Sequence, residues 1–276
     1  MYIFLEFTPF TPKQYIFWRG IGTAIILMPL FFIVPLNATW HFFALLCIIS
    51  FLAIYADIRM YHITDTYGSG ISTRIVPIVV FFSFIGTLII TPEIIERYCA
   101  HPKIALGITA CILISVYSAL HIRKCDVSKK AYIHAIPVFF IYAINNLLAK
   151  EALSYADVNG SYYYTLLQGW IIGLGSLVFY KGDTNHKLNS LMSSRKIIGL
   201  GLLLGIFVAF NMISRNFSFY YTDNISYPLS ISLLAPFWVL LFYAAIKRKE
   251  NNALIPGITI VLSAIALVLL TGQLTP

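Results

Sequence analysis

The sequence predicts an all-α membrane protein: a polytopic bundle of about nine transmembrane helices arranged as an inverted repeat. Composition is the first observation, because hydrophobic residues make up 59% of the 276 residues and charged residues only 11%. Second, apolar segments long enough to cross a bilayer recur along the whole chain. Third, the second half of the chain can be aligned with the first. A backbone inside lipid must hydrogen-bond to itself, so these segments are expected to be helices.

Each apolar segment approaches the ~20 residues that cross a hydrocarbon core of about 30 Å. Short connections rich in polar residues, Gly or Pro separate the segments, and the longest, 181–196, is a loop too short to fold alone. We predict spans at 15–35, 41–58, 68–91, 103–121, 132–150, 161–180, 197–214, 224–246 and 253–271.

Lysine and arginine are distributed unevenly between the two sides of the predicted bundle. Fifteen of the 19 basic residues fall on one side, and the other side receives Arg97, Lys103, Lys150 and Arg215. The positive-inside rule then places the N-terminus in the cytoplasm and the C-terminus outside. We therefore expect a multi-pass protein of the cytoplasmic (inner) membrane, surrounded by the lipid bilayer. The net charge of +8 needs no nucleic-acid partner.

Two pairs of segments carry the internal repeat. Tyr61–Pro77 aligns with Tyr220–Pro236, which also aligns Thr73 with Ser232. Earlier in each half, the pattern of a tyrosine, three residues, then Arg19-Gly20 matches the same spacing before Gln168-Gly169. The common order of these matches predicts two repeats.

The predicted repeats occupy 1–122, with four spans, and 131–276, with five. Equivalent helices are separated by an odd number of spans, so they run in opposite directions across the membrane. Inverted repeats of this kind are common in secondary transporters.

The segment from Tyr220 to Gly257 resembles the closing helices of the EamA-type drug/metabolite transporter superfamily. The segment around Arg19 is similar to that family's second helix, and Tyr61–Pro77 to its fourth. The resemblance implies ten helices in two inverted five-helix repeats around a central substrate cavity. The first of these helices is missing here, since Met1–Pro12 cannot span, and the outside C-terminus also departs from the family.

Polar residues inside apolar segments are the candidates for substrate contact, because they usually face a cavity or another helix. Asn145, Asn146, Gln168 and Asn211 are such residues. Each either contacts substrate or forms hydrogen bonds between packed helices. Gln168 and its repeat partner Arg19 are also candidates for interface anchors.

Arg74 lies about one turn inside its apolar segment. It either extends to the cytoplasmic interface or faces the cavity as an anchor for a carboxylate or phosphate. Two other charged combinations, Asp57 with Arg59 and Arg215 with Asp223, are expected to pair at the membrane edges.

Pro77 and Pro236 occupy matched positions and are candidate helix kinks, with either a mechanistic or only a packing role. Tyr220, Tyr227 and Trp238 give the segment around 224–246 an aromatic character. They belong either to an interfacial aromatic belt or to an aromatic substrate cavity.

Motifs for other activities are weak, so we expect neither an enzyme nor a cofactor. The four cysteines form no CxxC pair and have no metal-ligand spacing with the six histidines, so no metal site is predicted. We expect a secondary transporter of a small organic metabolite that works by alternating access. The alternatives are a non-transporting scaffold or accessory subunit and a flippase for a lipid-linked sugar. A homodimer is compatible with the sequence.

Overall fold

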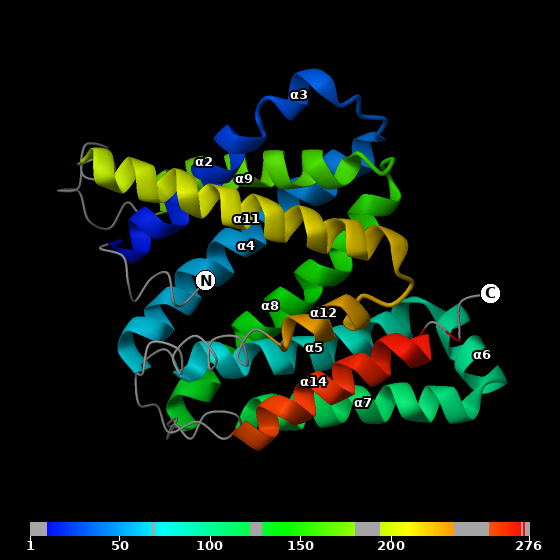
Figure 1. Ribbon diagram of the computed structural model, residues 1–276. Helices are drawn as coiled ribbons and strands as arrows, with labels where there is room; N and C mark the ends of the chain where they lie inside the picture. The colour runs from blue at the N-terminus through cyan, green and yellow to red at the C-terminus, as the bar shows by residue number, and fades with distance from the viewer. Residues whose placement is uncertain are drawn as a thin grey trace. The chain divides into compact units, whose positions relative to one another are not determined.

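The computed structural model describes residues 10–67, 70–121, 129–179, 194–234, 254–271 and 273, and within these ranges the chain is helical with no strand. An isolated antiparallel bridge joins Ala38 to Ala156. The predicted all-helical architecture is confirmed. The helices, labelled in Figure 1, are α2 (Pro12–Leu27), α3 (Leu30–Ile33), α4 (Trp40–Tyr67), α5 (Gly70–Ile90), α6 (Pro92–Ala100), α7 (Pro102–His121), α8 (Lys129–Ser154), α9 (Gly160–Phe179), α11 (Arg195–Tyr221), α12 (Ser226–Ser232) and α14 (Leu254–Thr271).

Each predicted apolar segment contains helix within the described residues, although the segment 15–35 is divided into α2 and α3. The segment 224–246 is described only in its first half, which contains α12. Two helices continue well beyond their apolar segments: α4 to Tyr67 rather than 58, and α11 to Tyr221 rather than 214. The backbone hydrogen bonds of a helix do not depend on side-chain polarity, so a helix can extend past the end of the apolar run.

Four helical stretches within the described ranges are long and apolar enough to cross a membrane: Gln14–Ile33, Trp40–Ile63, Ile133–Ser154 and Arg195–Tyr221. A fifth is added if α5 and α6 form one broken span, since Ile78–Ile90 and Pro92–Ala100 meet at 93°. Pro92 is the first residue of α6, and the residue before a proline is disfavoured in the helical region, which explains the break.

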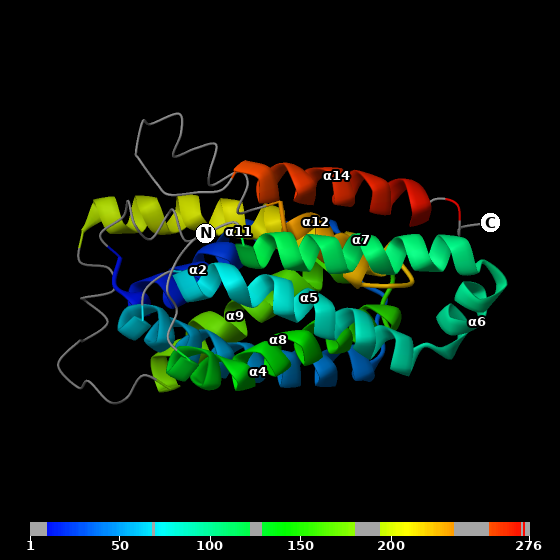
Figure 2. The same ribbon diagram turned by 90° about the horizontal axis from the view of Figure 1, so that it is seen from below.

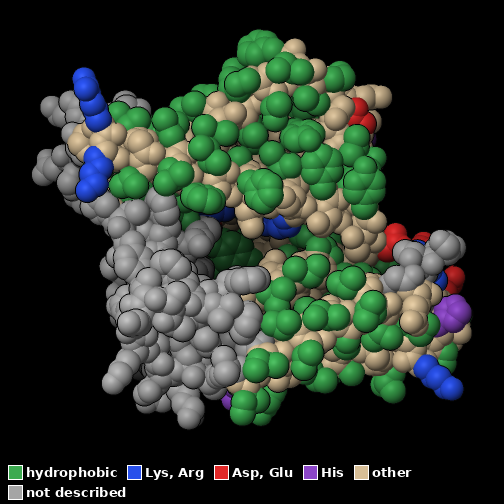
Figure 3. Space-filling model, viewed as in Figure 1, with side chains coloured by type: hydrophobic (Ala, Val, Ile, Leu, Met, Phe, Trp, Pro, Cys, Tyr) green, Lys and Arg blue, Asp and Glu red, His purple; other side chains and the backbone are tan. Residues whose placement is uncertain are grey.

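Large apolar side chains are exposed on these helices, including Phe32, Ile89, Leu106 and Phe210, each more than 70% exposed. Hydrophobic side chains cover most of the described surface on the face drawn in Figure 3. An aqueous protein rarely exposes so much apolar area, whereas a membrane protein presents it to lipid.

The chain divides into two compact units, and each takes one segment from either half of the sequence. Unit 1 comprises Met1–Tyr61 and Leu148–Tyr221, and unit 2 comprises His62–Leu147 and Thr222–Pro276. The units are therefore a different division from the predicted repeats, which stay a prediction. Helices α4 and α8 each contribute residues to both units.

Unit 1 is organised around α2, which packs on α9 and α11 through glycines. A Cβ added at Gly20 would lie 2.7 Å from the Gly169 carbonyl oxygen, and one at Gly169 would lie 2.9 Å from the Gly20 carbonyl oxygen. Gly22 approaches Gly201 in the same way, at 2.7 Å. Small residues allow such close approach of helix backbones in membranes, where packing rather than the hydrophobic effect holds helices together.

Helix directions in unit 1 follow from these contacts. On α9, Gly173 faces Gly20 while Gly169 also faces Ala24, so α2 and α9 are antiparallel. Helix α11 runs in the same direction as α2, because Gly201 contacts Trp18 and Gly205, one turn later, contacts Gly22. These two helices are parallel.

Unit 2 contains a second antiparallel pair, α7 and α14, which lie side by side in Figures 1 and 2. Gly107 faces Leu270 near one end. Further along, the Ser115 and Ser263 hydroxyl groups are hydrogen-bonded at 2.6 Å, and both are buried. Helix α5 packs against α7 and α12 within the same unit.

Candidate functional site

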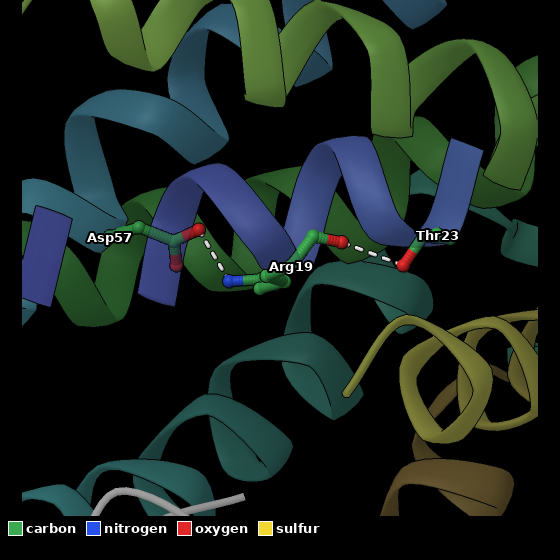
Figure 4. Close-up of polar contacts among 3 residues, drawn as sticks. All are labelled: Arg19, Thr23 and Asp57. Atoms are coloured by element: carbon green, nitrogen blue, oxygen red, sulfur yellow. Dashed lines mark hydrogen bonds and ion pairs between the residues drawn. The ribbon is translucent and has the colours of Figure 1, made fainter. Parts of the chain in front are cut away.

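A buried ion pair lies in unit 1. Arg19 Nη1 donates to Asp57 Oδ2 at 2.5 Å, with the Arg19 side chain 15% exposed and that of Asp57 4% (Figure 4). Charges inside an apolar helix bundle are costly, and they are usually found where they are paired and serve a function. We take this pair as the centre of the candidate site.

Local structure places both charges. Helix α2 begins with a capping box in which Thr11 and Gln14 exchange side-chain-to-backbone hydrogen bonds. Arg19 follows two turns later, directly before the glycine that contacts α9. The Thr23 hydroxyl donates to the Arg19 carbonyl at 2.6 Å, as Figure 4 shows. Asp57 lies on α4, where the helix continues for ten more residues, so the carboxylate is inside the helix rather than at its end.

The predicted edge pairs differ from the observed ones. Asp57 binds Arg19, while Arg59 is exposed and its guanidinium lies 5.5 Å from the centre of the Tyr55 ring. Asp57 is predicted at a span end because the apolar run stops there. The sequence places one arginine and one aspartate inside neighbouring apolar segments, but it does not show that they pair.

Gln168, predicted from the sequence, is buried at 4% exposure on α9. Its Nε2 donates weakly to the Tyr164 hydroxyl at 3.5 Å, and Tyr164 is itself fully buried. The Gln168 Oε1 atom is buried and has no hydrogen-bond partner among the described residues. A buried amide oxygen without a partner costs free energy, so this position is prepared for a further polar contact.

Arg215 lies on α11 beside the same tyrosine. Its guanidinium is 5.4 Å from the centre of the Phe219 ring, and it interacts electrostatically with Tyr164 and Arg19. The neighbouring Asn216 donates to the Thr165 hydroxyl at 3.0 Å, which ties α11 to α9 at this level. The pairing of Arg215 with Asp223 is not the observed one, since Asp223 forms an ion pair with Arg97 at 2.6 Å.

Unit 2 holds the other two predicted amides. Asn145 and Asn146 on α8 are 8% and 7% exposed. The Asn145 Oδ1 atom and the Ser83 hydroxyl oxygen on α5 are both buried without a hydrogen-bond partner among the described residues. The amides are therefore inside the protein, as either predicted role requires.

Tyr227 belongs to a polar group around the start of α12. Its hydroxyl is hydrogen-bonded to that of Tyr98 at 2.5 Å. The adjacent Asn224 Oδ1 accepts from the Ser226 amide at 3.0 Å and from the Ser226 hydroxyl at 2.6 Å. These contacts fix the connection into α12.

The remaining predicted residues are not shown to contact the ion pair, and some of them lie outside the described residues. Asn211 is exposed on α11, and Tyr220 is half-buried with its ring edge-on to Tyr221 at 5.1 Å. Arg74 and Pro77 are in α5, but their side chains are outside the described part. Pro236 and Trp238 lie outside the described residues altogether.

No family model matches the chain, and no curated protein is significantly similar to it. Within the described ranges, no three His, Cys, Asp or Glu side chains gather as metal ligands would. The geometry of the buried charges and amides therefore provides the basis for assigning a function.

Proposed function

We propose that the chain is a secondary transporter of a small organic metabolite in the cytoplasmic membrane, similar to the EamA-type drug/metabolite transporters. The observation that carries the proposal is the Arg19–Asp57 ion pair, buried between helices whose surfaces are apolar. A scaffold could pack the same helices with apolar side chains at no loss of stability. Retaining two charges there is better explained by a polar pathway.

Helix packing within the units also supports an inverted repeat. In unit 1, Gly20 and Gly169 are equivalent positions of the predicted repeat, and each faces the carbonyl oxygen of the other. Gly20 also faces Gly173, while Gly169 faces Ala24, which is the equivalent of Gly173. Such reciprocal contacts between antiparallel helices are expected near a two-fold axis in the membrane plane.

The α7–α14 pair follows the same logic in unit 2. These are the last helices of the two predicted repeats, and they are antiparallel with Ser115 bonded to Ser263. We infer an alternating-access mechanism in which one repeat moves relative to the other. In unit 1, Arg19 and Asp57 are assigned to solute binding or coupling, with Gln168 as a further polar contact.

Uptake into liposomes tests this proposal. The purified full chain is reconstituted and offered radiolabelled amino acids, carboxylates, sugars, phosphorylated sugars and amines, with protein-free liposomes as the control. Accumulation of at least one solute class above the control supports transport. Absence of uptake for every class contradicts it, and fluorescent lipid scrambling in the same vesicles would instead indicate a flippase.

A further inference from the structure

Arg19 and Arg215 place two partly buried guanidinium groups in unit 1. Asp57 forms an ion pair with Arg19. The positive charge of Arg19 acts unfavourably on the Arg215 guanidinium. A guanidinium among apolar helices is costly unless an anion or another acceptor satisfies it.

Arg215 has the hydrogen-bonding capacity for such an anion. Its Nε atom is buried and has no acceptor among the described residues. The Phe219 ring lies near the guanidinium and can stabilise the cation, but it does not satisfy the N–H donors. A guanidinium presents a planar set of donors that matches the two oxygens of a carboxylate or phosphate.

Polar neighbours surround this guanidinium. Tyr164 interacts with Arg215 and is hydrogen-bonded to Gln168, whose Oε1 atom is buried and unsatisfied. The Asn216–Thr165 hydrogen bond holds α11 and α9 together next to them. A hydrogen bond between the two helices, a guanidinium with an unsatisfied Nε donor and an unsatisfied amide oxygen within one cluster are features of a binding site rather than of simple packing.

We infer that Arg215 binds the carboxylate or phosphate group of the transported solute, with Arg19–Asp57 as a second charged group of unit 1 and the Gln168 Oε1 atom as an acceptor for a hydroxyl or ammonium group of the same solute. The inference rests on the proposed transport function and specifies the substrate class. The anionic group could belong to a soluble metabolite or to a lipid headgroup, which share this chemistry.

Binding and uptake are measured separately in the test. Purified protein in zwitterionic detergent is titrated with small carboxylates, phosphorylated sugars, short-chain phosphatidic acid, neutral sugars and amines, and its intrinsic tryptophan fluorescence is followed. The same compounds, the lipid excepted, are then offered to proteoliposomes. The variants are Arg215→Ala and Arg215→Lys, with Arg195→Ala, an exposed arginine on the same helix, as the matched control.

We expect anions to bind, and Arg215→Ala to weaken their binding about 10- to 100-fold, as is typical for loss of a hydrogen-bonded charged partner. Arg215→Lys should recover part of the affinity, and Arg195→Ala all of it. Soluble anions that bind and are accumulated indicate a metabolite, whereas binding of phosphatidic acid alone indicates a lipid headgroup.

Two results overturn the inference. The first is uptake of neutral or cationic solutes at the same rate by wild type and Arg215→Ala. This result would refute the anion site but would leave the proposed transport function intact. The other is anion binding that Arg215→Ala and Arg195→Ala affect equally. Conversely, Arg215-dependent anion binding without uptake of any solute would contradict transport and leave the anion site intact.

Discussion

The Arg19–Asp57 pair allows a test that separates a structural from a functional role. Arg19→Met or Asp57→Leu alone removes one partner and leaves the other charge buried, 15% or 4% exposed. Leaving an uncompensated charge in such a place typically costs about 3–5 kcal/mol of stability. The double variant removes both charges and fills the space with apolar side chains of similar size, so its stability should lie within about 1 kcal/mol of wild type.

Thermal unfolding in detergent, followed by tryptophan fluorescence and by size-exclusion chromatography after heating, measures the three variants. The exposed pair Arg97–Asp223, with side chains 44% and 56% exposed, is the matched control. Removing either partner there should cost no more than about 1 kcal/mol.

Uptake by the double Arg19→Met/Asp57→Leu variant then decides the role of the pair. If the charges serve transport, this stable variant loses uptake. Full uptake with wild-type stability would show that the pair is dispensable and refute our reasoning from buried charge to function. If the single variants are as stable as wild type, the remaining charge is not buried, and the expected loss of about 3–5 kcal/mol is refuted.

Three further predictions concern packing, the amides and orientation. Gly20→Ala should destabilise unit 1 by about 1–3 kcal/mol, because the added methyl group meets backbone atoms of α9, whereas Gly199→Ala has open space and should be neutral in the same melting assay. Asn145→Ala and Asn146→Ala should insert normally, and at least one should weaken solute binding by about 1–3 kcal/mol in a titration of the transported solute; unchanged binding in both would make them packing residues. Cys125, when the other cysteines are replaced, should react with an impermeant thiol reagent only from the cytoplasmic side, and labelling of intact cells would reverse the orientation.

The helical architecture could be predicted from composition because lipid leaves few alternatives for a spanning backbone. Apolar runs locate the helices. However, they report which side chains prefer lipid, and they do not show how far the backbone hydrogen bonds of the helix continue. For this reason α4 was predicted to end at 58, beside Asp57, although the helix continues to Tyr67. Placing Asp57 at an interface was a consequence of that boundary.

Pairing of Arg19 with Asp57 could not be predicted, because 38 residues separate them and periodicity does not specify which helices cross. A signal was present for other contacts of α2, those with α9 and α11. Gly169 and Gly173 on α9, and Gly201 and Gly205 on α11, have the small-xxx-small spacing that favours close helix contact in membranes. These motifs indicate that α9 and α11 pack closely on other helices, but they do not indicate that Arg19 meets Asp57 on α4.

The residue before the glycine contact differs between the two halves of the predicted repeat. In the predicted repeat, Arg19 precedes Gly20 and Gln168 precedes Gly169, so a charged and a neutral side chain occupy matched places beside the same helix contact. A charge there requires a counter-ion, which Asp57 provides; an amide requires none. If the proposed transporter binds its solute beside this contact, Gln168→Leu, which removes the unsatisfied amide oxygen without burying a charge, should disturb solute binding more than it disturbs folding.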